Sequence, residues 1–286
     1  MRKEWLKPVL DTILLFVMVF AVYVAVILAI SLCGGMNITG TPMQRVWKNC
    51  MLSLVQNGIF SCLTIFVVIR IWKKKINNLG LTSFKRDWKE LIIGFFVGAV
   101  GITISFLVML LSKSAEIESV SKQYIDVVAV NFLCYLFVGF GEEILFRGGI
   151  MLGLKETRNK EVIIGGSAVI FGAMHLGNNG VTFLAVGNLI LFGIVAGYCF
   201  YRSGSIWMTI GIHIAWNFLQ GNIYGFPVSG GQDYSIITIH IPKANWITGG
   251  TFGPEGGLGV TIALIFMFIF CKGYYRNQKE NAFLEQ

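Results

Sequence analysis

Polar side chains that are costly to bury stand inside apolar stretches at three places in this sequence. Glu142 and Glu143 are its only adjacent pair of acids, and His175 and His213 are two of its only three histidines. Ionisable residues at membrane depth are candidates for function. A carboxylate and an imidazole can together activate water, and nearby donors can stabilise an oxyanion. These residue types therefore predict an intramembrane hydrolase.

The spacing of these residues separates supporting groups from reactive ones. Residues three or four apart share one face of a helix, so Glu143 can pair with Arg147 and neutralise a buried charge. Glu142 is turned about 100° away from Glu143, and no such pair explains it. We therefore interpret Glu142 as an activated base. His213 and Asn217 are also four apart and should face the same cavity.

The composition indicates that membrane helices must position these groups. The chain is 55% hydrophobic and only 13% charged, with a mean hydropathy of +0.70. We expect an all-α polytopic helix bundle, one integral membrane domain over residues 1–286, with about eight transmembrane helices. The expected spans are 11–33, 50–71, 90–112, 125–154, 161–178, 182–201, 205–224 and 257–275.

The distribution of positive charge predicts the orientation of the bundle. With both termini cytoplasmic, 18 of the 23 Lys and Arg residues fall on the cytoplasmic side, as the positive-inside rule requires. The net charge of +8 is then a topology signal, and no basic soluble face indicates a nucleic-acid partner. We expect an integral protein of the bacterial cell membrane.

The three segments that carry these polar residues should place them at similar depths in the membrane. Counted from the nearest cytoplasmic charge, Glu142, His175 and His213 lie thirteen, fifteen and eleven residues into their spans. At the rise of an α-helix these positions are about 20, 22 and 16 Å deep. Because the depths come from separate loops, their agreement predicts one buried polar site.

Two connections between spans stand out. The basic stretch 72–89 should lie on anionic lipid headgroups. In the glycine-rich segment 225–256, the alternating run 235–241 favours a short strand or hairpin that covers the outer face. We expect His240 in this run to be dispensable, and Glu255 to favour the positive N-terminal end of the last helix.

Other features favour structural roles. Gly94-x-x-x-Gly98 and Gly193-x-x-x-Gly197 would let helices approach closely, and Asn188 would form a hydrogen bond between helices. The six cysteines stand singly, without a C-x-x-C pair, and indicate neither a zinc knuckle nor a disulfide framework.

The three segments together resemble the CPBP family of CAAX proteases and bacteriocin-processing enzymes, also called Abi proteins, which includes the type II CAAX prenyl endopeptidase. The family motifs E-E-x-x-x-R, F-x-x-x-H and H-x-x-x-N are matched in order, with no departure. The matching residues are Glu142, Glu143, Arg147, Phe171, His175, His213 and Asn217. The resemblance covers about residues 124–220, the expected catalytic core, and continues more loosely through the glycine-rich segment.

This resemblance implies peptide-bond hydrolysis within the membrane. Glu142, aided by His175, would take a proton from the attacking water, and His213 and Asn217 would donate hydrogen bonds to the oxyanion. Two histidines and a carboxylate could alternatively bind zinc through Glu142, His175 and His213. H-E-x-x-H is absent and the histidines lie on different helices, so a metal-free glutamate mechanism without a cofactor is favoured.

The expected partners are the lipid bilayer and a membrane-associated protein or peptide substrate. A prenylated C-terminus, a bacteriocin leader, a signalling peptide and an anchored protein all remain open as substrates. Two other classes compete with a protease. One is a transporter with an intramembrane proton or ion site, although no internal repeat supports it. The other is a non-catalytic bacteriocin-immunity or regulatory protein.

Overall fold

The computed structural model of the chain describes residues 2–33, 39–277 and 282–285. In this part the chain forms a helical bundle with one small sheet at an end. The helices are α1 (Arg2–Leu32), α2 (Pro42–Phe66), α3 (Phe84–Leu111), α4 (Ile125–Glu143), α5 (Leu152–Leu154), α6 (Lys160–Met174), α7 (Phe183–Ser203), α8 (Trp207–Phe218), α9 (Leu258–Tyr274) and α10 (Ala282–Glu285), and the strands are β1 (Glu116–Val120) and β2 (Ile237–His240).

Tighter and wider helical turns extend several of these helices. The π-helical turns are Val67–Ile71, Ile144–Met151 and Leu219–Ile223, and the 3-10 turns are Ile76–Leu79, Lys155–Thr157, Gly250–Phe252 and Pro254–Gly256. The turn Ile144–Met151 joins α4 to α5, so the expected long fourth span exists as one helical segment.

Five helical segments of the described residues are long and apolar enough to cross a membrane. They are Trp5–Leu32, Pro42–Ile71, Ile76–Leu111, Ile125–Thr157 and Phe183–Ser203, with Leu258–Tyr274 as a shorter apolar helix. The prediction of an all-α membrane bundle is confirmed at this level, but the count of eight spans is not.

Two of the expected spans are shorter than the sequence suggested. The helix expected over 161–178 is α6, which has 15 residues and ends at Met174, before the turn-forming residues Gly177-Asn178-Asn179-Gly180. The span expected over 205–224 divides into α8 and the π-helical turn Leu219–Ile223. Apolar composition predicted both segments, but it did not reveal where the α-helical geometry stops.

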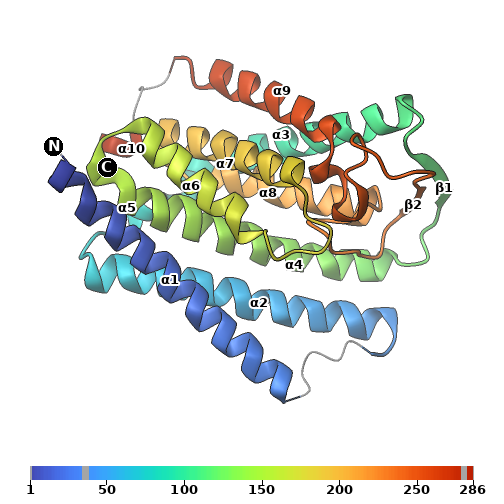
Figure 1. Cartoon of the computed structure of the whole chain (residues 1–286), viewed down its shortest axis with the longest axis horizontal. Helices are drawn as coiled ribbons and strands as arrows, with labels where there is room; N and C mark the ends of the chain where they lie inside the picture. The colour runs from blue at the N-terminus through green and yellow to red at the C-terminus, as the bar shows by residue number, and fades with distance from the viewer. Residues whose placement is uncertain (1, 34–38, 278–281, 286) are drawn as a thin grey trace.

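The centre of the bundle is built on α8. This helix packs against α3 and α4, while α2 packs against α4, α6 pairs with α7, and α9 contacts α3 and α7. The beginning of α1 and the short α10 lie at one end of the molecule, and β1 and β2 lie at the other (Figure 1). We call these the terminal end and the strand end.

Glycines allow the closest helix contacts. A Cβ atom at Gly94 or Gly98 would collide with backbone atoms of α8, and one at Gly211 would collide with backbone atoms of α3. A Cβ atom at Gly193 would press on the backbone of Ala168 in α6. The prediction that both Gly-x-x-x-Gly motifs serve helix packing is therefore confirmed.

The strand predicted in 235–241 is present as β2. It pairs antiparallel with β1, and His240 stands opposite Glu116. The partner is a distant segment and not the other arm of a hairpin, because α3 ends at the same end of the bundle as the 225–256 segment (Figure 1).

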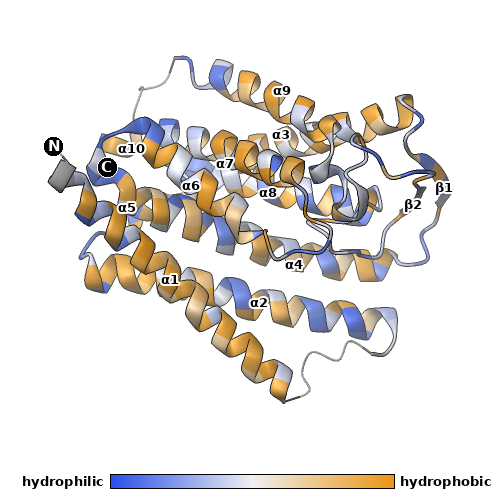
Figure 2. Ribbon diagram, viewed as in Figure 1, coloured by the Kyte–Doolittle hydropathy of each residue, from blue (hydrophilic) through white to orange (hydrophobic). Residues whose placement is uncertain are grey.

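α1 contrasts with the core of the bundle. It is hydrophobic along most of its length (Figure 2), and side chains such as Leu14 and Leu28 are exposed. An apolar surface of this extent fits contact with lipid. α1 therefore borders the bundle and contributes only a few residues to its interior, whereas α8 is buried from Met208 to Asn217.

Candidate active site

Glu142 and Glu143 are the last two residues of α4, and Arg147 lies in the π-helical turn Ile144–Met151 that follows. All three side chains are buried, Glu143 and Arg147 completely. π-helical turns are rare and occur often at functional sites. The sequence motif located these residues but gave no sign that the helix widens at this point.

The expected pair between Glu143 and Arg147 is present. Arg147 Nη1 donates to Glu143 Oε1 at 3.0 Å, and the guanidinium carbon lies 5.1 Å from the centre of the Phe171 ring. A buried charge needs such partners. The pair joins the first motif to the second, because Phe171 belongs to α6.

His213 brings the third motif to the same carboxylates. Its Nδ1 lies 2.9 Å from Glu143 Oε1, and its Nε2 lies 3.7 Å from Glu142 Oε2. Because an ionised carboxylate only accepts hydrogen bonds, Nδ1 carries a proton and donates to Glu143. Glu143 thus orients His213 as well as balancing Arg147, a second role that the i to i+4 spacing did not predict.

His175 caps the C-terminal end of α6. Its Nδ1 lies 2.9 Å from the carbonyl oxygen of Phe171. A carbonyl oxygen only accepts, so Nδ1 is the protonated nitrogen, and Nε2 of the neutral ring keeps its lone pair. His175 is therefore held in the tautomer whose Nε2 can accept a proton.

These groups meet at one cavity of about 430 Å³. Glu142, His175, His213 and Asn217 all line it, whereas Glu143 and Arg147 lie behind its wall. The structure thus brings together the four residues that we expected to be catalytic. His240 lies on β2 and does not line the cavity.

The donor set does not fit the zinc alternative. Among the residues that the structure describes, no three His, Cys, Asp or Glu side chains are grouped as ligands for a metal ion. Glu142, His175 and His213 share a cavity without forming a ligand set, and we derive no step through a metal.

Two carboxylates in the cavity wall were not identified from the sequence as site residues. Asp233 accepts a hydrogen bond from the Tyr135 hydroxyl, and Glu255 Oε2 accepts hydrogen bonds from the Ser229 backbone N–H and from its hydroxyl, the latter at 3.0 Å. Burial raises the pKa of both carboxyl groups. The only sequence signal was the glycine-rich setting of these residues.

Glu255 lies directly before the last helix, as expected, and it also makes a contact that the sequence did not predict. Glu255 lies in the 3-10 turn before α9, and no side chain caps that helix. Its carboxylate joins the turn to Ser229. Asn188 behaves as expected, because it accepts from Thr261 of α9 and donates to the Glu255 carbonyl oxygen.

Residues 125–219 match the family model described as type II CAAX prenyl endopeptidase Rce1-like. This region contains all three motifs and every residue of the site described above except Asp233, Ser229 and Glu255. The match supports a CAAX protease family assignment for this region, and the predicted resemblance to the type II CAAX prenyl endopeptidase is confirmed.

One similar curated protein is the uncharacterized protein YyaK of Bacillus subtilis (strain 168). It is 23% identical over 196 residues, which cover 63% of this chain and 64% of YyaK. The match thus spans less than two thirds of that relative. No solved structure matches the chain.

Proposed function

We propose that this protein is an intramembrane endopeptidase that hydrolyses a peptide bond of a membrane-associated protein or peptide. The observation that carries the proposal is the meeting of Glu142, His175, His213 and Asn217 at one cavity. The family match supports the class of reaction. The geometry supports a division of roles among the four residues.

Glu142 and His175 are suited to activate water. Glu142 Oε2 has no hydrogen-bond partner within the described chain, and His175 presents Nε2 because Phe171 holds its Nδ1. In the proposed step Glu142 takes a proton from water, with help from His175, as the water oxygen attacks the scissile carbonyl carbon. The proton then passes to the leaving amine as the C–N bond breaks.

His213 and Asn217 are suited to stabilise the oxyanion of the tetrahedral intermediate. They lie one helical turn apart on α8 and both line the cavity. The Asn217 amide can donate directly. His213 can donate from Nε2 when the ring is doubly protonated, and the carboxylates of Glu142 and Glu143 beside it favour that form. Hydrogen bonds placed in advance for the oxyanion lower the barrier.

A comparison of membrane proteomes tests the proposed activity. Cells expressing the wild type and cells expressing Glu142→Gln are labelled at newly formed protein N-termini, with His240→Ala as the control. We expect new termini in the wild type and in His240→Ala that are absent from Glu142→Gln. Identical termini in all three strains would oppose the proposal, and a transporter or a non-catalytic partner predicts that outcome.

A further inference from the structure

The cavity lies off-centre along the bundle. Its deep part is formed by Glu142 and His213, and its other wall is formed by the 225–256 segment, through Val228, Ser229, Gly231, Gln232, Asp233 and Glu255. That segment belongs to the strand end of the molecule (Figure 1). Among the described residues, none that lines the cavity comes from α5, α10 or the turn Ile76–Leu79 at the terminal end.

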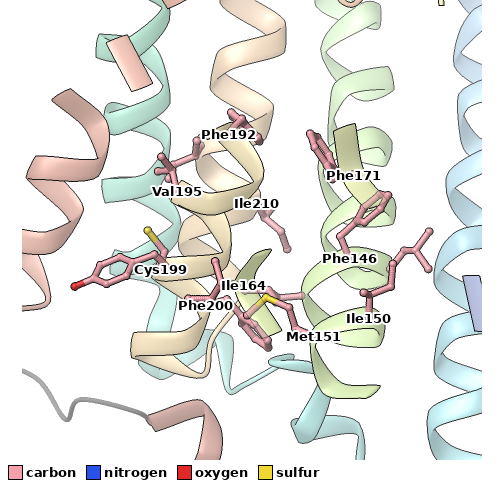
Figure 3. Packing of buried hydrophobic residues seen from close by; sticks show 14 of the residues in the cluster. Phe146, Ile150, Met151, Ile164, Phe171, Phe192, Val195, Cys199, Phe200 and Ile210 are labelled. Atoms are coloured by element: carbon pink, nitrogen blue, oxygen red, sulfur yellow. The ribbon is translucent and has the colours of Figure 1, made fainter. Parts of the chain in front are cut away.

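A packed and largely apolar layer separates the cavity from the terminal end. Phe146, Ile150 and Met151 follow Glu142 along the chain and are completely buried. They pack with Ile164 of α6 and Phe200 of α7, each near the terminal end of its helix (Figure 3). Interiors of this kind are close-packed and leave no passage for a peptide. Access from the terminal end is therefore blocked.

The shortness of α6 opens the opposite side. A helix of 15 residues is about 22 Å long, whereas the hydrocarbon core of a bilayer is about 30 Å thick. His175 and the turn that contains Asn178 therefore lie below the membrane surface and line the cavity. Irregular backbone at such a depth is tolerated where it borders protein or a water-filled cavity. Water can thus reach His175 from the strand end.

The charges distinguish the two ends of the bundle. Lys74 pairs with Glu156 at 3.1 Å at the terminal end, and Lys155 and Arg158 lie in the same turn as Glu156. The basic stretch 72–89, which leads from α2 into α3, and the basic connection 155–160 between α5 and α6 both lie at this end (Figure 1). By the positive-inside rule the terminal end is cytoplasmic.

We propose that the site takes its substrate from the extracytoplasmic face of the membrane. This rests on the proposed function and adds a substrate class: a peptide segment that has been exported, or that is inserted into the outer half of the bilayer. A lipid-modified C-terminus in the cytoplasm would approach the sealed terminal end. An extended segment of about seven residues spans the roughly 25 Å from the outer end of α4 to Glu142.

Cysteine accessibility tests the orientation without needing any activity. In a background with the exposed Cys33 and Cys62 changed to Ser, Gln232→Cys probes the cavity mouth and Glu156→Cys probes the terminal end; both native side chains are exposed. Intact bacterial cells are treated with a membrane-impermeant maleimide. We expect Gln232→Cys to react in intact cells and Glu156→Cys only after permeabilisation. The reverse pattern would overturn the proposal.

The positions of cleaved bonds provide a separate test. Bonds whose cleavage requires Glu142 should map to exported or outward-facing segments, and labelling of Gln232→Cys in intact cells should reduce their cleavage at least tenfold. Cleavage of cytoplasmic C-termini would overturn the proposal while leaving the protease activity standing. Failure to find any cleavage would oppose the proposed function, and the labelling result would still decide the orientation.

Discussion

The two sides of the cavity hold their buried carboxylates in different ways. On the deep side, Glu143 lies between the guanidinium of Arg147 and the imidazole of His213, at 3.0 and 2.9 Å. At the mouth, Glu255 is held by the neutral donors of Ser229. The first arrangement balances charge within packed helices, and the second joins two loops. In the proposed function the deep side carries the chemistry, and the loops at the mouth determine the shape of the entrance through which a substrate reaches it.

The backbone shows the same contrast. Ser229 has a φ of 47°, a backbone conformation that few residues other than glycine adopt. Gly230 follows with a φ of 86°. Backbone in such conformations persists where the surroundings determine it. The deep side instead uses helical backbone, widened into a π-helical turn. Substitutions on the two sides should therefore differ in both the kind and the size of their effects.

After the loss of Glu142 itself, the largest expected effect is the loss of the His175 imidazole that assists it. His175→Ala should lower turnover by about 10²–10⁴, the usual contribution of general acid–base catalysis. His240→Ala, on β2 outside the cavity, should keep wild-type turnover. Both variants are measured on one cleaved peptide after reconstitution in liposomes. An active His175→Ala enzyme, or an inactive His240→Ala enzyme, would show that the site is misplaced.

Breaking the charge balance on the deep side should affect folding before activity. Arg147→Ala leaves Glu143 buried without its cation, and removing one partner of a buried pair costs about 3–5 kcal/mol. The Tm of Arg147→Ala in detergent should be lower than that of the wild type, and its purification should give less folded protein. The double variant Glu143→Gln with Arg147→Met should recover part of the loss. An unchanged Tm for Arg147→Ala would refute the stabilising role of the pair.

The oxyanion role predicts an effect on rate without a comparable effect on binding. Asn217→Ala should lower kcat by about 10²–10³ with KM little changed, because the lost hydrogen bond forms mainly in the transition state. Asn188→Ala is a matched control, since Asn188 also borders the cavity but donates to the backbone of the 254–257 turn. Equal losses in the two variants would argue for a purely structural Asn217.

The smallest effect is expected at the mouth and depends on pH. Burial raises the pKa of Glu255 above its ordinary value of 4.5, so the folded state holds this proton to higher pH than the unfolded state. Its contribution to stability is fully present below pH 4.5 and is lost as pH rises through the folded pKa. Glu255→Gln keeps an acceptor for Ser229 without this ionisation.

The Tm of Glu255→Gln minus the Tm of the wild type should therefore rise as pH increases from about 4 to 8. The exposed Glu118 of β1 provides the control Glu118→Gln, whose transition should follow the wild type across the range. A difference between Glu255→Gln and the wild type that is constant with pH would show that Glu255 does not titrate in this way.

The sequence predicted the deep side better than the mouth. Helical spacing was enough to pair Glu143 with Arg147, and helical rise was enough to place Glu142 near His213. The π-helical turn was not predictable, because one wider turn leaves the apolar pattern almost unchanged. The contact of Glu255 with Ser229 was not predicted, because it joins two loops that are far apart in sequence and follow no period.

The central claim is that Glu142 activates water for peptide hydrolysis. The most direct test is the turnover of one identified peptide by purified protein in liposomes, after exhaustive chelation and with elemental analysis. Wild type is compared with a Glu142→Gln variant that has the same thermal transition. We predict that the chelated wild type keeps its turnover and that Glu142→Gln has none. Wild-type turnover by Glu142→Gln, or activity that follows one zinc ion per chain, would contradict the account.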